Sequence, residues 1–122
     1  MQLMGRGLLP EIVGHRGAAA AAPENTLESL RLAAEHGARM VEFDAKLTSD
    51  GVVILMHDDT LDRTTSGHGR VAATSWADIR SLDAGAWFGS RWRGSRVPCL
   101  EEAIGVLDEC ALAANIEIKP CQ

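Results

Sequence analysis

The chain has 122 residues, is 46% hydrophobic and 24% charged, and carries a formal net charge of −5 at pH 7. These values are typical of one globular domain with a modest core. The negative charge argues against a general binder of nucleic acid or anionic membranes. The sequence has neither an apolar stretch long enough to span a membrane nor a signal-peptide-like N-terminus, so we expect a cytoplasmic protein. Cys99, Cys110 and Cys121 lack the spacing of a metal site and are expected to be free thiols.

The first predicted strand covers residues 11–15 and ends in the segment Gly14-His15-Arg16-Gly17. Glycines on both sides of His15 and Arg16 permit a tight turn or the close approach of a ligand. For this pair alone, solvated side chains at a turn are the simpler alternative.

A helix is predicted to open at Asn25-Thr26-Leu27-Glu28. Asn25 is expected as its N-cap, and the Glu28 carboxylate is expected to reach back to the cap. An apolar stripe then repeats at helical spacing. Gly37 is expected to end the helix.

Two acidic residues share one face of the next predicted strand, which covers residues 39–47. Alternate side chains of a strand point the same way, so Glu42 and Asp44 should lie close together. Two carboxylates at that distance repel each other unless a cation lies between them. A hard divalent cation that prefers oxygen ligands meets this requirement.

The apolar run at residues 52–57 predicts another strand, after the turn signal Ser49-Asp50-Gly51. The link between the two strands is short for a crossover helix, so the residues alone also permit a hairpin. The run is equally compatible with a strand that is buried on both faces of a parallel sheet. In a parallel sheet His57 would stand at the carboxyl edge, where such folds place their sites.

Residues 58–97 are predicted to form a long excursion with a short helix near Ser75. Trp76 is expected to belong to a small satellite core that holds the excursion together. Trp87 and Phe88, flanked by glycine, are expected to wall a pocket over the carboxyl edge of the sheet.

The last two predicted elements are a helix at residues 98–110 and a strand at residues 114–120. Cys99 stands where a capping Ser or Thr would be expected at the start of this helix. On the strand, Glu117 and Lys119 share one face because they are two residues apart.

Short motifs occur in a fixed order along almost the whole chain, from about Ile12 to Pro120. They are Gly14-His15-Arg16-Gly17, Pro23-Glu24-Asn25-Thr26, Glu42-Phe43-Asp44, Asp50-Gly51, His57-Asp58, Leu61-Asp62-Arg63-Thr64-Thr65, Leu82-Asp83-Ala84-Gly85 and Asn115-Ile116-Glu117-Ile118-Lys119. Each motif alone is weak. In this order and spacing, the set resembles the glycerophosphodiester phosphodiesterase family, most closely its bacterial cytoplasmic type.

The resemblance implies an α/β fold of the (β/α)8 TIM-barrel type, with a small insertion after the third strand. Residues 58–97 correspond to this insertion, and the strand at residues 52–57 would then run parallel to its neighbours. Because an eight-stranded barrel needs about 250 residues, residues 1–122 are expected to form the N-terminal half, with about four β/α units. Such a truncated product or fragment would have unpaired strand edges and could self-associate.

The resemblance also implies metal-dependent hydrolysis of glycerophosphodiesters to glycerol 3-phosphate and an alcohol, within lipid and glycerol metabolism. It assigns general acid–base catalysis to His15 and His57, phosphate contacts to Arg16 and Lys119, and the ligation of Mg²⁺ or Ca²⁺ to Glu42, Asp44 and Glu117. An arginine offers paired donors to a phosphate and a lysine a point charge. Histidine titrates near neutral pH, which suits both acid and base roles, and the sequence leaves open which histidine takes which.

Two alternatives stay open. A phospholipase D-like lyase of the same barrel superfamily shares the histidine and acidic pattern, but such enzymes are usually secreted and disulfide-bonded, and this sequence predicts neither. The second alternative is a truncated, non-catalytic fragment that binds metal or phosphate and cannot turn over. Metal-dependent turnover would separate this fragment from an enzyme.

Overall fold

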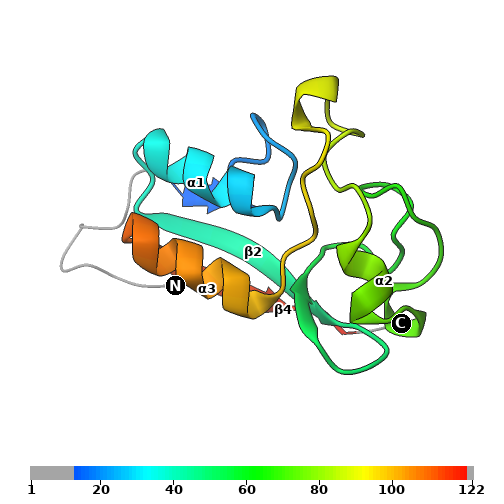
Figure 1. Ribbon diagram of the computed structural model, residues 1–122. Coiled ribbons are helices and arrows are strands. Elements are labelled where there is room, and N and C mark those ends of the chain that lie inside the picture. The colour runs from blue at the N-terminus through cyan, green and yellow to red at the C-terminus, as the bar shows by residue number, and fades with distance from the viewer. Residues whose placement is uncertain (1–12, 121–122) are drawn as a thin grey trace.

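The computed structural model describes residues 13–120, which form an α/β unit built on a four-stranded sheet (Figure 1). The long strand β2 (Met40–Leu47) lies at its centre. Strands β1 (Val13–His15) and β4 (Ala113–Ile118) pair with β2 in parallel. The predicted start of the first strand at residues 11–12 and the Cys121 thiol lie outside the described residues, whereas Cys99 and Cys110 are free thiols as expected.

The strand register brings the predicted site residues to one edge of the sheet. His15 of β1 lies opposite Glu42 of β2, and Asp44 of β2 lies opposite Glu117 of β4. Parallel strands end at the same edge, so residues near their carboxyl ends become neighbours although they are far apart in sequence. This α/β arrangement of parallel strands is consistent with the barrel fold that the sequence motifs imply.

The strand β3 (Val53–Leu55) runs antiparallel to β2, with Ala45 opposite Leu55. The prediction that this strand runs parallel is therefore wrong. The reason is the short link, in which the Thr48 amide donates to the Val52 carbonyl at 3.0 Å and Gly51 adopts a φ of +82°. Such a tight turn joins antiparallel neighbours, whereas a parallel pair needs a crossover of a dozen or more residues. The described sheet thus has three parallel strands, and the predicted count of four β/α units is not confirmed.

The helix α1 (Leu27–Glu35) is capped by Thr26 rather than by Asn25. The Thr26 hydroxyl accepts from the Ser29 amide at 3.2 Å, and the Ser29 hydroxyl accepts from the Thr26 amide at 3.2 Å. This reciprocal pair is a capping box one residue later than predicted. Asn25 has a φ of +58° and turns its side chain toward the sheet instead. Gly37 follows the helix with a φ of +93°, as its role as terminator requires.

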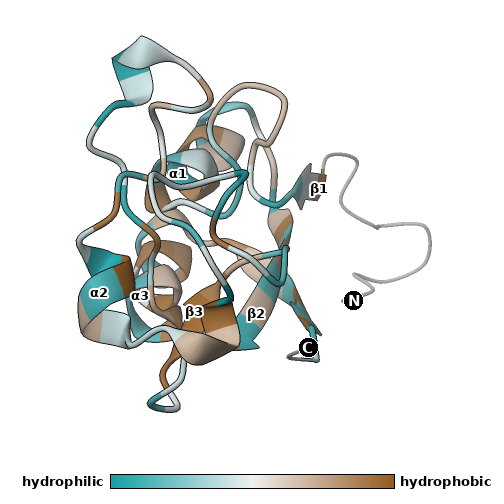
Figure 2. Ribbon diagram, turned by 90° about the vertical axis from the view of Figure 1, so that its right-hand side faces the viewer, coloured by the Kyte–Doolittle hydropathy of each residue, from teal (hydrophilic) through white to brown (hydrophobic). Residues whose placement is uncertain are grey.

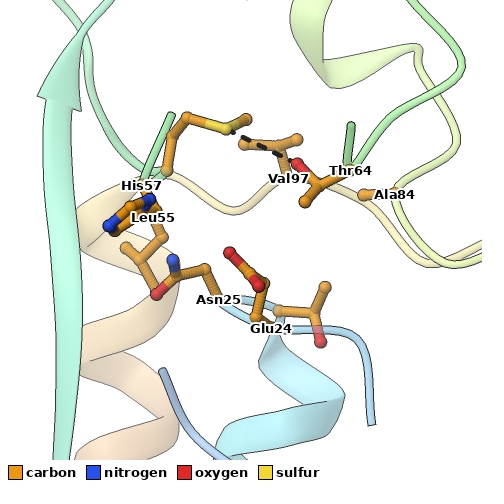
Figure 3. A pocket seen from close by; sticks show the side chains of 9 residues that line it. Glu24, Asn25, Leu55, His57, Thr64, Ala84 and Val97 are labelled. Carbon is orange, nitrogen blue, oxygen red and sulfur yellow. Dashed lines mark hydrogen bonds between the residues drawn. The ribbon is translucent and has the colours of Figure 1, made fainter. Parts of the chain in front are cut away.

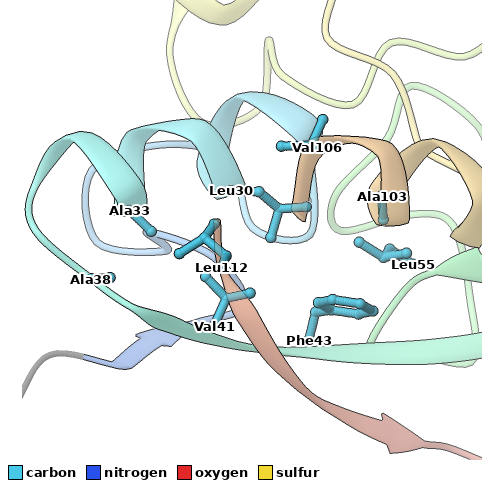
Figure 4. Close-up of a cluster of buried hydrophobic side chains, with 9 residues drawn as sticks. All are labelled: Leu30, Ala33, Ala38, Val41, Phe43, Leu55, Ala103, Val106 and Leu112. Atoms are coloured by element: carbon cyan, nitrogen blue, oxygen red, sulfur yellow. The ribbon is translucent and has the colours of Figure 1, made fainter. Parts of the chain in front are cut away.

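The helix α3 (Leu100–Cys110) lies beside α1, and the two helices cover one face of β2 (Figure 1). At its start the Glu102 carboxylate accepts from the Cys99 amide at 3.0 Å. Figure 4 shows the main core between these helices and the sheet. Its buried members are Leu30, Ala33, Ala38, Val41, Phe43, Leu55, Ala103, Val106 and Leu112.

The excursion between β3 and α3 has a core of its own. It contains the short helix α2 (Trp76–Arg80), whose first turn is capped by the Ser75 hydroxyl, and two 3-10 turns at Val71–Ala73 and Ser90–Trp92. Trp76 packs against its edge, which confirms the predicted satellite core. The hydrophobic strand β3, brown in Figure 2, supplies Ile54 to this second core. Among the described residues, no helix has the length and apolar character needed to cross a membrane.

Candidate active site

Three carboxylates converge at the carboxyl edge of the sheet. Glu42 and Asp44 lie on one face of β2, and Glu117 comes from the neighbouring β4. One oxygen from each of the three lies within 4.8 Å of the others. Asp44 is only 1% exposed, whereas Glu117 is exposed to solvent. The structure therefore brings together the three residues that the sequence motifs assign to a metal.

The electrostatics of this cluster favour a cation. Burial, together with the neighbouring Asp44 carboxylate, raises the pKa of Glu42. A hydrogen bond from Lys119, whose Nζ lies 3.3 Å from the Glu117 carboxylate, lowers the pKa of Glu117. Because the donors are all carboxylate oxygens, the set fits a hard divalent cation such as Mg²⁺ or Ca²⁺ rather than a soft one. Lys119 thus lies beside the cluster, and its predicted contact with a phosphate stays a prediction.

The His15-Arg16 segment contacts the cluster. His15 Nε2 is 3.7 Å from the Glu42 carboxylate. Arg16 has a φ of +52°, and its backbone amide donates to the Glu42 carboxylate at 3.3 Å. Gly17 must stay glycine here, because a Cβ atom at this position would overlap the Ser29 side chain. The glycine-flanked turn therefore packs closely against α1. It also places His15 and Arg16 next to the acids of the cluster.

The Arg16 side chain is held between two carboxylates. Its Nη1 donates to both Glu24 oxygens at 3.2 and 3.1 Å, and its Nε lies 3.5 Å from Asp44 Oδ2. Asn25 also holds Asp44: its side-chain amide donates to Oδ2 at 3.2 Å, and its carbonyl oxygen accepts from the Asp44 backbone amide at 3.3 Å. Sequence reasoning assigned no site role to Glu24 or Asn25, although both belong to one of the motifs.

His57 follows β3, and a carboxylate holds one of its ring nitrogens. Its Nδ1 lies 2.9 Å from Asp58 Oδ1. Arg63 donates to both Asp58 oxygens, at 2.9 and 2.8 Å. Hydrogen bonding from Arg63 holds the pKa of Asp58 well below its usual range, so this carboxyl is ionised. Asp58 and Arg63 were also missed as site residues, because only the folded chain shows that they meet.

Lys46 continues the face of β2 that carries Glu42 and Asp44, and it is 4% exposed. Its ammonium donates to Asp59 Oδ1 at 2.7 Å and to the Pro120 carbonyl at 3.1 Å. It joins β2 to the start of the excursion and to the residues after β4. Sequence reasoning did not single out Lys46, although its position two residues after Asp44 already predicts that it lies on the same face of the strand.

A small cavity of about 10 Å³, which is room for roughly one water molecule, lies next to His57 (Figure 3). Its lining residues are Glu24, Asn25, Thr26, Leu55, Met56, His57, Thr64, Ala84 and Val97. Trp87 and Phe88 do not line this cavity, so their expected role as pocket walls stays a prediction. Trp87 is 40% exposed, its ring packs edge-on against Phe88 at 5.6 Å, and its indole N–H donates to the Ala84 carbonyl.

Residues 15–122 match the model of the glycerophosphoryl diester phosphodiesterase family. Every site residue described above lies within this match. The chain therefore belongs to this family, as its motifs predicted.

The chain is similar to proteins that are named as members of this family. It is 41% identical over 108 residues to a glycerophosphodiester phosphodiesterase of Caldanaerobacter subterraneus subsp. tengcongensis, covering 88% of this chain and 44% of that protein. A glycerophosphodiester phosphodiesterase of Bacillus subtilis is 43% identical over 115 residues, and the match covers 88% of this chain and 38% of that protein.

Solved structures give the same result. An Oleispira antarctica phosphodiesterase in complex with the product sn-glycerol-3-phosphate superposes with a TM-score of 0.91 at 43% identity, covering 94% of this chain and 47% of that chain. A glycerophosphodiester phosphodiesterase from Agrobacterium tumefaciens superposes with a TM-score of 0.87 at 42% identity, and the match covers 93% of this chain and 48% of that chain. The chain thus spans less than half the length of these four proteins.

Proposed function

We propose that this chain is a metal-dependent phosphodiesterase that hydrolyses glycerophosphodiesters to glycerol 3-phosphate and an alcohol. The observation that carries the proposal is the meeting of three carboxylates, His15 and Arg16 at one edge of the sheet. The similar Oleispira antarctica phosphodiesterase, whose structure contains sn-glycerol-3-phosphate as its product, supports the same substrate class.

The cationic side chains bind the phosphodiester in this proposal. Arg16 offers paired donors to the phosphate oxygens, and Lys119, just after β4, offers a point charge. Both already lie against site carboxylates, Arg16 beside Asp44 and Lys119 beside Glu117. Each of the two positive charges therefore lies beside a different acid of the cluster, which supports a role for both in binding an anionic substrate there.

The acidic residues would hold the divalent cation. Glu42, Asp44 and Glu117 supply oxygen ligands, and Asn25 keeps Asp44 in place through two hydrogen bonds. Held by these residues, a Mg²⁺ or Ca²⁺ ion would supply Lewis-acid chemistry: it would neutralise charge on the phosphate and polarise the nucleophile. Without a cation, burial and the proximity of Asp44 disfavour the ionised form of Glu42.

The two histidines move protons. One takes a proton from the nucleophile, and the other gives a proton to the departing alkoxide. His15 lies beside Glu42, whereas His57 is anchored through Nδ1 by Asp58, which leaves Nε2 to face a reacting group. Both assignments, as acid and as base, are chemically possible for each histidine.

The proposal also includes the domain boundaries, the kind of substrate, the cellular location and the self-association that the sequence predicts. Residues 1–122 form part of a barrel domain of this family, with residues 58–97 as its insertion. The substrate is a small molecule, the protein acts in the cytoplasm, and exposed strand edges allow copies of the chain to associate.

Release of glycerol 3-phosphate from glycerophosphocholine tests the proposal. The purified chain is assayed with Mg²⁺, with Ca²⁺ and with chelator, and its folding is checked by circular dichroism. We expect chelator-sensitive release that is lost in His15→Ala and in His57→Ala. His68→Ala is the matched control, because His68 is an exposed histidine that also contacts an aspartate but lies outside the site. A folded wild-type chain that releases no product would overturn the proposal and favour the non-catalytic alternative.

A further inference from the structure

A chain of charged contacts joins His57 to Arg16 by way of Arg63. Arg63 Nη1 and Nη2 donate to the two Glu24 oxygens at 3.1 and 2.9 Å, and Glu24 also accepts from Arg16. On its other side, Arg63 donates to both oxygens of Asp58, which contacts His57 Nδ1. One guanidinium therefore contacts two carboxylates, each of which holds a different site residue.

We propose that Arg63 is a positioning residue that fixes His57 through Asp58 and Arg16 through Glu24. The inference rests on the proposed function, since it concerns how two of its site residues are held. Among the described residues, the polar partners of Arg63 are Asp58 and Glu24 and not the three acids of the cluster.

The geometry separates this network from an ordinary surface ion pair. An isolated exposed pair contributes little because its side chains are mobile and solvated. Here both contacts are paired, and the Glu24 side chain is only 9% exposed. The Arg63 guanidinium also lies 5.9 Å from the centre of the Trp87 ring, which limits its movement. Paired donors on two fixed carboxylates define the orientation of each carboxylate as well as its charge.

The orientation of Asp58 decides which nitrogen of His57 carries the proton. An ionised carboxylate only accepts hydrogen bonds, so Nδ1 of the neutral ring must donate to Asp58. Nε2 is then left without a proton and can accept one from a reacting group. Arg63 keeps Asp58 aimed at Nδ1, and so keeps His57 in this tautomer.

The test reads the tautomer directly, by nitrogen-15 NMR of the histidine rings at alkaline pH. The chain has four histidines, so the spectrum is simple. We expect wild-type His57 to carry its proton on Nδ1. In Arg63→Leu and in Asp58→Asn this signal should be lost or replaced by a mixture of tautomers. Arg63→Lys keeps the charge but cannot form both paired contacts, so it should show the same loss if Arg63→Leu fails to fold.

Two further variants make the test specific. Arg91→Leu is the matched control, because Arg91 also lies over a tryptophan ring, 4.8 Å from Trp92, but lies outside the network. Glu24→Gln weakens the contacts of Glu24 to both Arg16 and Arg63 but leaves the contacts between Arg63 and Asp58 in place, so it should leave the His57 tautomer unchanged. If the chain turns over, Glu24→Gln should mainly raise KM, Asp58→Asn should mainly lower kcat, and Arg63→Leu should do both.

An unchanged Nδ1 signal in folded Arg63→Leu or Arg63→Lys would overturn the inference. An equal change in Arg91→Leu would do so as well, since it would indicate general loosening of the insertion. Because the tautomer is read without turnover, an inactive wild-type chain would count against the proposed function and not against this inference.

Discussion

The neighbouring strands β2 and β4 run parallel and both supply acids to one site, yet their environments differ. On β2, Val41 and Phe43 are fully buried under the two long helices. On β4, Ile116 is 39% exposed and Ile118 is 83% exposed. Among the described residues β4 pairs only with β2, so its other edge carries no strand. Strand register alone can therefore bring a metal-ligating side chain to the site, whereas burial determines how firmly that side chain is held.

The same contrast holds for the acids themselves. Asp44 is buried and is restrained by Asn25 and by Arg16. Glu117 is exposed, and Lys119, which directly follows β4, is its cationic partner. The position of Asp44 on β2 is therefore fixed by burial and hydrogen bonds. The position of Glu117 depends on how rigid the exposed strand β4 is in solution.

Truncation of a core side chain should show the largest difference between the strands. Phe43→Ala removes a fully buried ring from the main core, so we expect a loss of roughly 3–5 kcal/mol in the free energy of unfolding. Ile118→Ala on β4 should change it by less than about 0.5 kcal/mol, because most of that side chain is already in water. Urea denaturation measures both. Similar losses in the two variants would refute the contrast.

Removal of the side chains that contact Asp44 and Glu117 should give a smaller difference in the free energy of unfolding between the two strands than truncation of their apolar side chains. Asn25→Ala deletes both hydrogen bonds to Asp44 and puts alanine at a φ of +58°, so we expect a loss of roughly 2–4 kcal/mol. Lys119→Ala removes an exposed contact to Glu117 and should leave the free energy of unfolding nearly unchanged. A stability change in Lys119→Ala as large as that in Asn25→Ala would show that β4 is held as firmly as β2.

The pH dependence of stability should differ in sign between Glu42 and Glu117 when divalent cations are removed by chelator. The pKa of Glu42 is raised above its ordinary value of 4.5 by burial and by Asp44, so the folded state binds its proton more tightly and stability falls as the pH rises through the raised pKa. Glu42→Gln should therefore be more stable than wild type at neutral pH, with a difference that vanishes below pH 4.5. The readout is the urea midpoint across the pH range.

For Glu117 the sign is opposite. Its pKa is lowered from 4.5, so its stabilising contribution is present above that pH and is lost as the pH falls through the lowered pKa. Glu117→Gln should be slightly less stable than wild type at neutral pH and equal to it in acid. Parallel pH profiles for the two variants would contradict the assigned environments.

Much of the site could be predicted from the sequence. The alternation of Glu42 and Asp44 along one strand gave their common face, and the motif order linked them to His15 and to Glu117. These inferences need only the period of a strand and the rule that parallel strands end at one edge.

The remaining features depend on geometry that a sequence does not show. The short link after β2 makes β3 antiparallel, although its apolar run suits a parallel strand equally well. The cap of α1 moved to Thr26 because Asn25 is used to hold Asp44. The contact between Glu24 and Arg63 spans 39 residues, and no local pattern predicts such a pairing.

Calorimetric titration of Ca²⁺ and of Mg²⁺ into the chain tests the central claim most directly, namely that β2 and β4 together form one cation site. We predict a single site whose affinity falls by at least about tenfold in Asp44→Asn and in Glu117→Gln. Asp62→Asn, which changes an exposed carboxylate of the excursion, is the control and should bind as wild type does. Binding that is absent, or that survives Glu117→Gln unchanged, would contradict the claim.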